Sequence, residues 1–110
     1  KLVSTLRLKG YRLVLISNTN QMHFEYAKKR YPVLRQFHRH ILSYKEKRRK
    51  PDERIYRQAM RACRAKAREI FYIDDRADLT EAADALGFHT HTFKKDHDVL
   101  VRRMKAMKVL

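Results

Sequence analysis

Residues 68–79 read REIFYIDDRADL, and this stretch decides both the fold and the position of a candidate site. Residues 70–73 are largely apolar, long enough for a buried strand, and run directly into Asp74 and Asp75. Two neighbouring carboxylates are costly, because each raises the free energy of ionising the other. Acidic residues are favoured at helix N-termini, and this preference explains the carboxylates further along the chain. It explains a pair of carboxylates at the end of a strand poorly. We therefore interpret the pair as functional.

The sequence around this stretch alternates strand and helix patterns. Apolar runs predict strands at residues 12–17, 40–43, 69–74 and 88–93, and helical periodicity predicts helices at 21–29, 51–63, 78–86 and 96–107. Gly10 and Gly87 each stand between a predicted helix end and a predicted strand, where a positive φ is needed. Strands that alternate with helices predict an α/β fold with a parallel sheet and helices on both faces.

Length and composition predict one domain over residues 1–110 and no second domain, since 110 residues support a single core. Cys63 is the only cysteine, which excludes an internal disulfide and fits a reducing compartment such as the cytoplasm. No apolar run has the length of a membrane span. The chain begins with Lys1 rather than Met, so we expect a fragment or a processed piece. Nothing in the sequence specifies an oligomeric state.

Two further polar clusters fall where α/β proteins bind ligands, outside the carboxyl ends of parallel strands. Residues 17–20, Ser-Asn-Thr-Asn, follow the most apolar predicted strand; a helix N-cap is the alternative interpretation. Lys50 precedes Pro51 at the start of a predicted helix, where a lysine opposes the helix dipole. The alternative for Lys50 is the end of a solvated basic run, residues 45–50.

These three clusters, in this order, resemble the haloacid-dehalogenase-like (HAD) hydrolase superfamily, particularly its phosphatase-type members. LVLISNTN at residues 13–20 is similar to the family's second motif, and RRKPDERIYRQAM at 48–60 is similar to the third. IFYIDDRADLTEAADALGFHTHTF at 70–93 is similar to the fourth motif in its double-aspartate version. A response-regulator receiver domain uses similar residues, but there the acidic pair precedes the lysine. The resemblance implies a three-layer, Rossmann-like parallel sheet.

The resemblance also implies roles for individual residues. Ser17, Asn18 and Thr19 would contact a substrate phosphate, and Lys50 would bind it as a cation. Asp75 would ligate Mg²⁺ directly, and Asp74 would orient Lys50 and the metal shell. The implied activity is that of a phosphatase on a small phosphate monoester, with phosphoryl transfer to an aspartate followed by hydrolysis.

Two features depart from the family's pattern. The family's nucleophile is the first aspartate of a DxD motif after the first strand, yet the first acidic residue here is Glu25. We therefore expect the first strand, the nucleophile and any cap, which sets substrate identity, to lie outside this chain, and the chain alone to be inactive. In addition, Leu79 stands where double-aspartate members usually have Asn, and Arg76 could screen the acidic pair. A non-catalytic HAD-like paralogue is one alternative.

A basic nucleic-acid-binding module is the other alternative. The formal net charge is +15, with 27 Lys and Arg against 12 Asp and Glu, which favours phosphate-bearing partners. Arg61, Arg64 and Arg68 have the spacing of one helical face, and further cations crowd the last predicted helix. No sequence-reading motif accompanies them, so any binding to nucleic acid is expected to be nonspecific.

Overall fold

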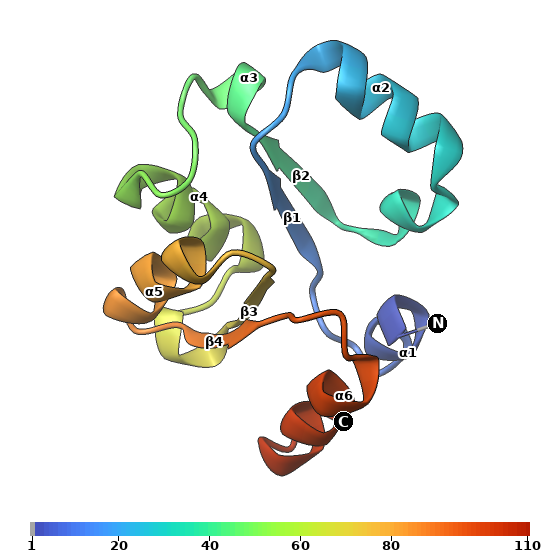
Figure 1. The fold of residues 1–110 in the computed structure, drawn as a ribbon, viewed down its shortest axis with the longest axis vertical. Coiled ribbons are helices and arrows are strands. Elements are labelled where there is room, and N and C mark those ends of the chain that lie inside the picture. The colour runs from blue at the N-terminus through green and yellow to red at the C-terminus, as the bar shows by residue number, and fades with distance from the viewer. Residues whose placement is uncertain (1) are drawn as a thin grey trace. The chain divides into compact units, whose positions relative to one another are not determined.

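The structure is a computed structural model that describes residues 2–110. Contacts along the chain divide it into two units, Lys1–Ala65 and Lys66–Leu110. Each unit holds one pair of parallel strands with helices around it (Figure 1). The predicted α/β class with parallel strands is confirmed, and the strands form two pairs, β1–β2 and β3–β4.

The first unit contains α1 (Leu2–Leu8), β1 (Val14–Ser17), α2 (Gln21–Arg30), the 3₁₀ turn η1 (Pro32–Gln36), β2 (Arg39–Leu42), α3 (Ser43–Glu46) and α4 (Glu53–Cys63). Strand β1 pairs in parallel with β2 and places Ser17 opposite Leu42 at the carboxyl end. Helices α2 and α4 lie on opposite sides of this pair (Figure 1). Helix α4 packs on both strands, and the residues of β1 are half-buried.

The core of the first unit forms where α4 packs on the strands. Ile41 and Leu42 of β2 and Ile55 and Tyr56 of α4 are each at most 2% exposed. Helix α4 begins at Glu53, two residues later than predicted, because the Asp52 carboxylate caps it by accepting from the Arg54 amide at 2.9 Å.

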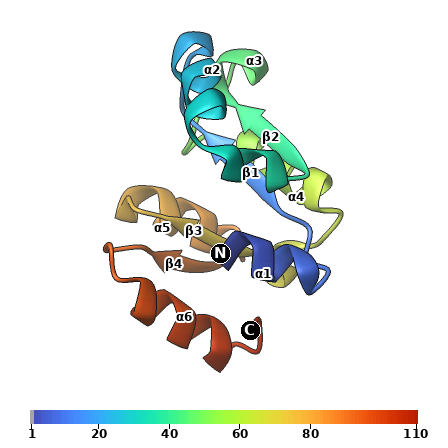
Figure 2. The same ribbon diagram turned by 90° about the vertical axis from the view of Figure 1, so that its right-hand side faces the viewer.

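The second unit contains η2 (Ala67–Glu69), β3 (Phe71–Asp74), α5 (Ala77–Ala85), β4 (His89–Thr92) and α6 (His97–Ala106). Strands β3 and β4 are parallel, with Asp74 opposite Thr92 at the carboxyl end. Helices α5 and α6 lie on opposite sides of β4 (Figure 2). Leu79 and Ala83 from α5, together with Phe88, fill the core of this unit.

The predicted glycine turns are confirmed, with φ of +92° at Gly10 and +98° at Gly87. At Gly87 a Cβ would lie 3.5 Å from the Cβ of Ala67, an ordinary contact distance, so the left-handed backbone is what favours glycine there. Among residues 2–110, no helix has the length and apolar character needed to cross a membrane. The expectation of a single domain stays a prediction.

Candidate active site

The loop after β1 carries the first candidate cluster. Ser17 is the last residue of β1, and within residues 2–110 its hydroxyl makes no hydrogen bond. Asn20 caps α2, since its Oδ1 accepts from the His23 amide at 2.9 Å. The N-cap interpretation therefore holds for Asn20 but does not account for Ser17, Asn18 or Thr19.

Asn18 and Lys50 are brought together, as the motif order implied. The Asn18 side chain donates from Nδ2 to the Lys50 carbonyl at 3.1 Å and accepts from the Lys50 amide through Oδ1 at 2.8 Å. The Asn18 amide group is therefore committed at both ends to the Lys50 main chain. The Lys50–Pro51 peptide bond is cis.

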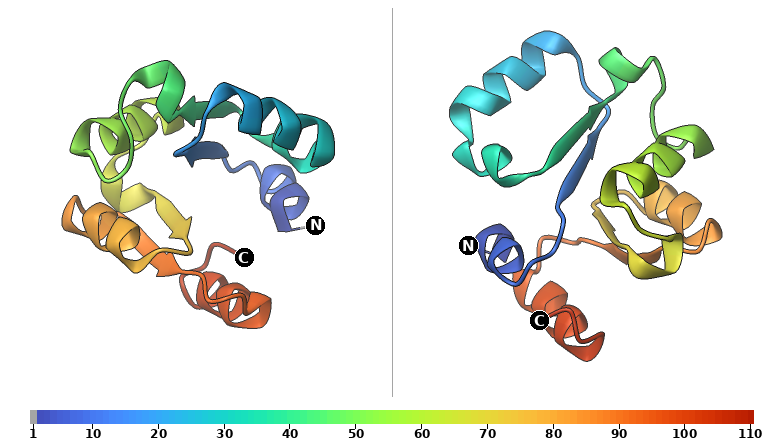
Figure 3. Two further views of the ribbon diagram at one scale, coloured as in Figure 1. Left: turned by 45° about the horizontal axis from the view of Figure 1, so that its top comes forward. Right: turned by 180° about the vertical axis from the view of Figure 1, so that it is seen from behind.

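Ser43, which the sequence reasoning missed, is bonded to the same loop. Its hydroxyl accepts from the Thr19 amide at 2.8 Å and donates to the Thr19 carbonyl at 2.9 Å. The available signal was positional: Ser43 follows β2 directly, just as Asn18 follows β1. Figure 3 shows α3, which begins at Ser43, at the same end of the β1–β2 pair as the loop after β1.

The acidic pair at the end of β3 has two different environments. The half-buried Asp74 carboxylate accepts from the Tyr72 hydroxyl at 2.5 Å and from the Arg76 amide at 3.3 Å. Asp75 is exposed and, within the described residues, makes no hydrogen bond or ion pair with its carboxylate. One carboxylate is thus held in place and the other is accessible.

This arrangement fits Mg²⁺, which proteins commonly bind through one or two carboxylates while several ligand positions stay with water or substrate. An exposed, unpaired Asp75 carboxylate is a suitable oxygen ligand. Over residues 2–110 no group of three or more His, Cys, Asp or Glu side chains is placed to hold a metal ion. The guanidinium of Arg76 bonds Asp78 at 3.2 and 2.8 Å rather than either member of the pair.

The predicted site residues divide between the two units. Ser17, Asn18, Thr19 and Lys50 belong to the first unit, whereas Asp74 and Asp75 belong to the second. The hydrogen bonds join Asn18 directly to Lys50. The role of Asp74 in orienting Lys50 stays a prediction.

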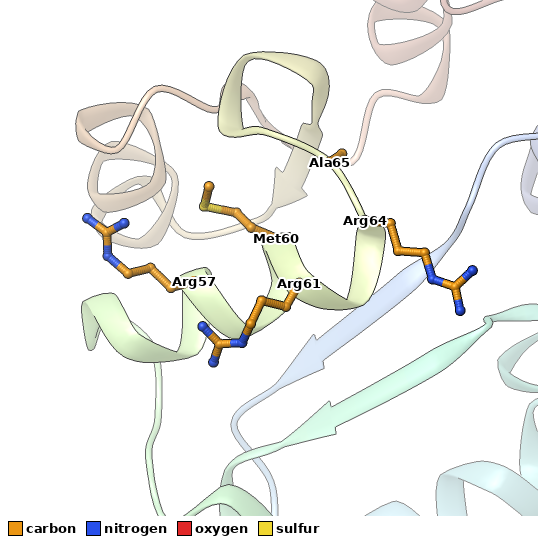
Figure 4. A pocket seen from close by; sticks show the side chains of 5 residues that line it. All are labelled: Arg57, Met60, Arg61, Arg64 and Ala65. Atoms are coloured by element: carbon orange, nitrogen blue, oxygen red, sulfur yellow. The ribbon is translucent and has the colours of Figure 1, made fainter.

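The arginines of α4 form a different surface feature. Arg57, Met60, Arg61, Arg64 and Ala65 line a depression of about 370 Å³ (Figure 4). The guanidinium groups of Arg61 and Arg64 point apart in Figure 4, so they do not converge on one anion. The prediction of a single helical face with Arg68 is wrong, because α4 ends at Cys63 and Arg68 lies in η2.

The single cysteine is not set up as a nucleophile. Cys63 is half-buried at the end of α4, and this burial raises the pKa of its thiol, against a smaller opposing effect of Arg12. The thiol is therefore protonated at neutral pH, and protonated thiols are poor nucleophiles. Chemistry at this chain is expected at the polar loops instead.

Comparison with known proteins agrees with this geometry. The family model described as haloacid dehalogenase-like hydrolase matches residues 1–87, and the chain therefore belongs to the HAD-like hydrolases. The resemblance seen in the motifs is confirmed at this level, and with it the Rossmann-like α/β fold class.

Solved structures of the family resemble this chain closely. A HAD family enzyme from Bacteroides thetaiotaomicron, solved as the wild-type protein with magnesium and inorganic phosphate, is 32% identical with a TM-score of 0.81. The match covers 90% of this chain and 54% of that enzyme. A predicted HAD-like family hydrolase from Porphyromonas gingivalis is 26% identical with a TM-score of 0.82, over 97% of this chain and 55% of that protein. The chain thus spans about half the length of these relatives.

Proposed function

We propose that this chain is part of a Mg²⁺-dependent phosphatase that hydrolyses a small phosphate monoester. The attacking aspartate lies outside these 110 residues, because no acidic residue precedes Glu25. The observation that carries the proposal is the pair of hydrogen bonds, 2.8 and 3.1 Å, that joins the loop after β1 to Lys50. The Bacteroides enzyme, solved with magnesium and inorganic phosphate, supports the same chemistry.

The residues of this chain would bind and neutralise the transferring phosphoryl group. The Ser17 hydroxyl and the Asn18 main-chain amide donate to one phosphoryl oxygen, since the Thr19 amide is already bonded to Ser43. The Lys50 ammonium balances the negative charge of the phosphoryl oxygens. Asp75 would hold Mg²⁺, which would supply further positive charge to the phosphoryl group. Asp74 would orient Lys50 and the metal shell.

Two displacements at phosphorus complete the proposed reaction. An aspartate carboxylate attacks phosphorus, the bond to the alcohol oxygen breaks, and the second aspartate of the same DxD motif gives its proton to the leaving alcohol; it takes a proton back from water in the next step. Water then attacks the aspartyl-phosphate, releasing inorganic phosphate and restoring the carboxylate. A reducing compartment such as the cytoplasm fits the single cysteine.

Replacing Lys50 tests the proposal in the full-length protein that contains this chain. Lys50→Ala should lower kcat/KM for p-nitrophenyl phosphate by about 100-fold or more, since it removes a charge that acts in the transition state. Lys47→Ala is the matched control, because Lys47 is exposed in the same basic segment. Unchanged turnover in Lys50→Ala would overturn the proposed role of this site.

The 110-residue chain by itself should show no Mg²⁺-dependent turnover, because the nucleophile is absent from it. The measurement is phosphate release by the purified chain beside the full-length protein at equal concentration. Measurable turnover by the chain would contradict the placement of the nucleophile outside it.

A non-catalytic HAD-like paralogue is the second candidate. The observation that favours it is Leu79, 3% exposed and packed in the core where double-aspartate members usually carry Asn. Absence of phosphatase turnover in the full-length protein, together with retained binding of inorganic phosphate, would favour this candidate.

A further inference from the structure

We infer that the side chains of Asn18 and Ser43 have a positioning role: they fix Lys50 and the loop after β1 in one arrangement, rather than binding the substrate directly. The inference rests on the proposed function, because it assigns their purpose to the placement of Lys50.

The first observation is that the Asn18 amide group bonds the Lys50 main chain through both its nitrogen and its oxygen. Its Nδ2 and Oδ1 bond the carbonyl and the amide of the same residue, Lys50, across 32 positions of sequence. Both bonds are part-buried, so water competes with them less than on an open surface. These two bonds fix the orientation of the Asn18 side chain against the Lys50 main chain and leave one Nδ2 hydrogen outside them.

The second observation is the two-sided bond of Ser43. Its hydroxyl binds both the amide and the carbonyl of Thr19 at 2.8 and 2.9 Å. The Thr19 amide is therefore occupied, which leaves Ser17 and the Asn18 main-chain amide as phosphate donors.

The two sets of bonds act on the two ends of one segment. Ser43 begins the segment and Lys50 ends it, and residues 44–49 between them are rich in mutually repelling cations. Tying both ends to residues 18 and 19 limits how far Lys50 can move from Ser17. Small displacements of a catalytic group of this kind lower rates by about 100-fold.

Kinetics of the full-length protein test the inference. Asn18→Ala and Ser43→Ala should each lower kcat/KM for p-nitrophenyl phosphate by about 10- to 100-fold and weaken inhibition by inorganic phosphate. Ser4→Ala is the matched control, because Ser4 Oγ also bonds a distant residue, Gln36 Oε1 at 2.9 Å, away from the site. Circular dichroism and thermal melting establish that each variant is folded.

A double-variant cycle separates positioning from direct contact. If Asn18 acts through Lys50, Asn18→Ala in a Lys50→Ala background should cause little further loss, whereas two independent phosphate contacts should give additive losses. Ser43→Thr keeps the hydroxyl and should restore most of the activity. Ser43→Cys replaces Ser43→Ala if that variant does not fold, since a thiol is of similar shape but bonds weakly.

Each outcome decides one question. The inference is overturned by additive losses in the cycle, or by normal kinetics in both Asn18→Ala and Ser43→Ala. In that case an impaired Lys50→Ala protein would still uphold the proposed function. Normal kinetics in Lys50→Ala overturns the proposed function itself, and the inference fails with it.

Discussion

At the scale of single residues, Asp74 and Asp75 are sequence neighbours with different surroundings. Asp74 is held by the Tyr72 hydroxyl, whereas Asp75 is exposed and, within residues 2–110, unpaired. Asp75→Asn in the full-length protein should therefore lower activity by about 100-fold or more and abolish its dependence on Mg²⁺, because an amide is a much weaker ligand than a carboxylate. The measurement is phosphate release against Mg²⁺ concentration.

The control for this variant is Asp84→Asn, which removes the same charge from an exposed position in α5. It should leave the Mg²⁺ titration unchanged. An Asp75→Asn protein that responds to Mg²⁺ like the parent would refute the assignment of Asp75 as ligand.

Leu79 lies in α5, the helix that follows the acidic pair, and its side chain is part of the hydrophobic core. It is 3% exposed and packs in the second unit. Leu79→Asn should lower the free energy of unfolding by about 2–5 kcal/mol, because it removes buried apolar surface and buries an amide. Urea denaturation measures the change, with the exposed Glu81→Gln as control. Equal unfolding midpoints for Leu79→Asn and the parent would contradict this placement.

At the scale of elements, the start of α4 depends on an ionised cap. Hydrogen bonds from the Arg54 side chain and then its amide lower the pKa of Asp52 from 3.8 to about 2. Because the folded pKa lies below the ordinary value, the stabilisation is complete above about pH 4 and is lost as the pH falls towards 2.

Asp52→Asn tests this dependence, since Asn also caps helices but does not titrate. The parent should have the higher urea midpoint at pH 5 to 7, and the difference should shrink between about pH 4 and pH 2. A difference that stays constant over this range would show that ionisation of Asp52 does not contribute.

The elements that the sequence predicted were those with a local signal. Apolar periodicity located α4 and α5, and Gly10 and Gly87 marked the turns. Helix α3 and the turns η1 and η2 were missed because they are too short to give a periodic pattern in the sequence. Predicted ends also shifted where a side chain supplied a cap, as Asp52 does for α4.

At the scale of the whole molecule, motif order alone predicted which residues form the candidate site, but not how their side chains bond one another. Sequence reasoning did not foresee that the Asn18 side chain bonds Lys50, and it overlooked Ser43. Both omissions have one physical cause: a polar side chain after a strand can bond a ligand or a neighbouring loop. Only the positions of both loops decide between these partners.

The excess of positive charge predicts a second property of the whole chain, weak binding to any duplex DNA. With a net charge of +15, the chain should bind generic DNA at 50 mM salt and lose about a thousandfold or more in affinity by 200 mM, because binding releases counterions. Fluorescence anisotropy with two unrelated duplexes over a salt series measures this loss.

Matched charge reversals show whether any one surface is responsible. The first triple variant changes three exposed cations in and just after α3 to Glu: Lys45, Lys47 and Arg49. The second changes three exposed cations near the end of the chain to Glu: Arg102, Lys105 and Lys108. Both variants change the net charge equally, so binding that depends on overall charge should weaken to a similar extent in each. Loss of binding in only one variant, or tight salt-resistant binding to one duplex, would instead reveal a specific nucleic-acid site.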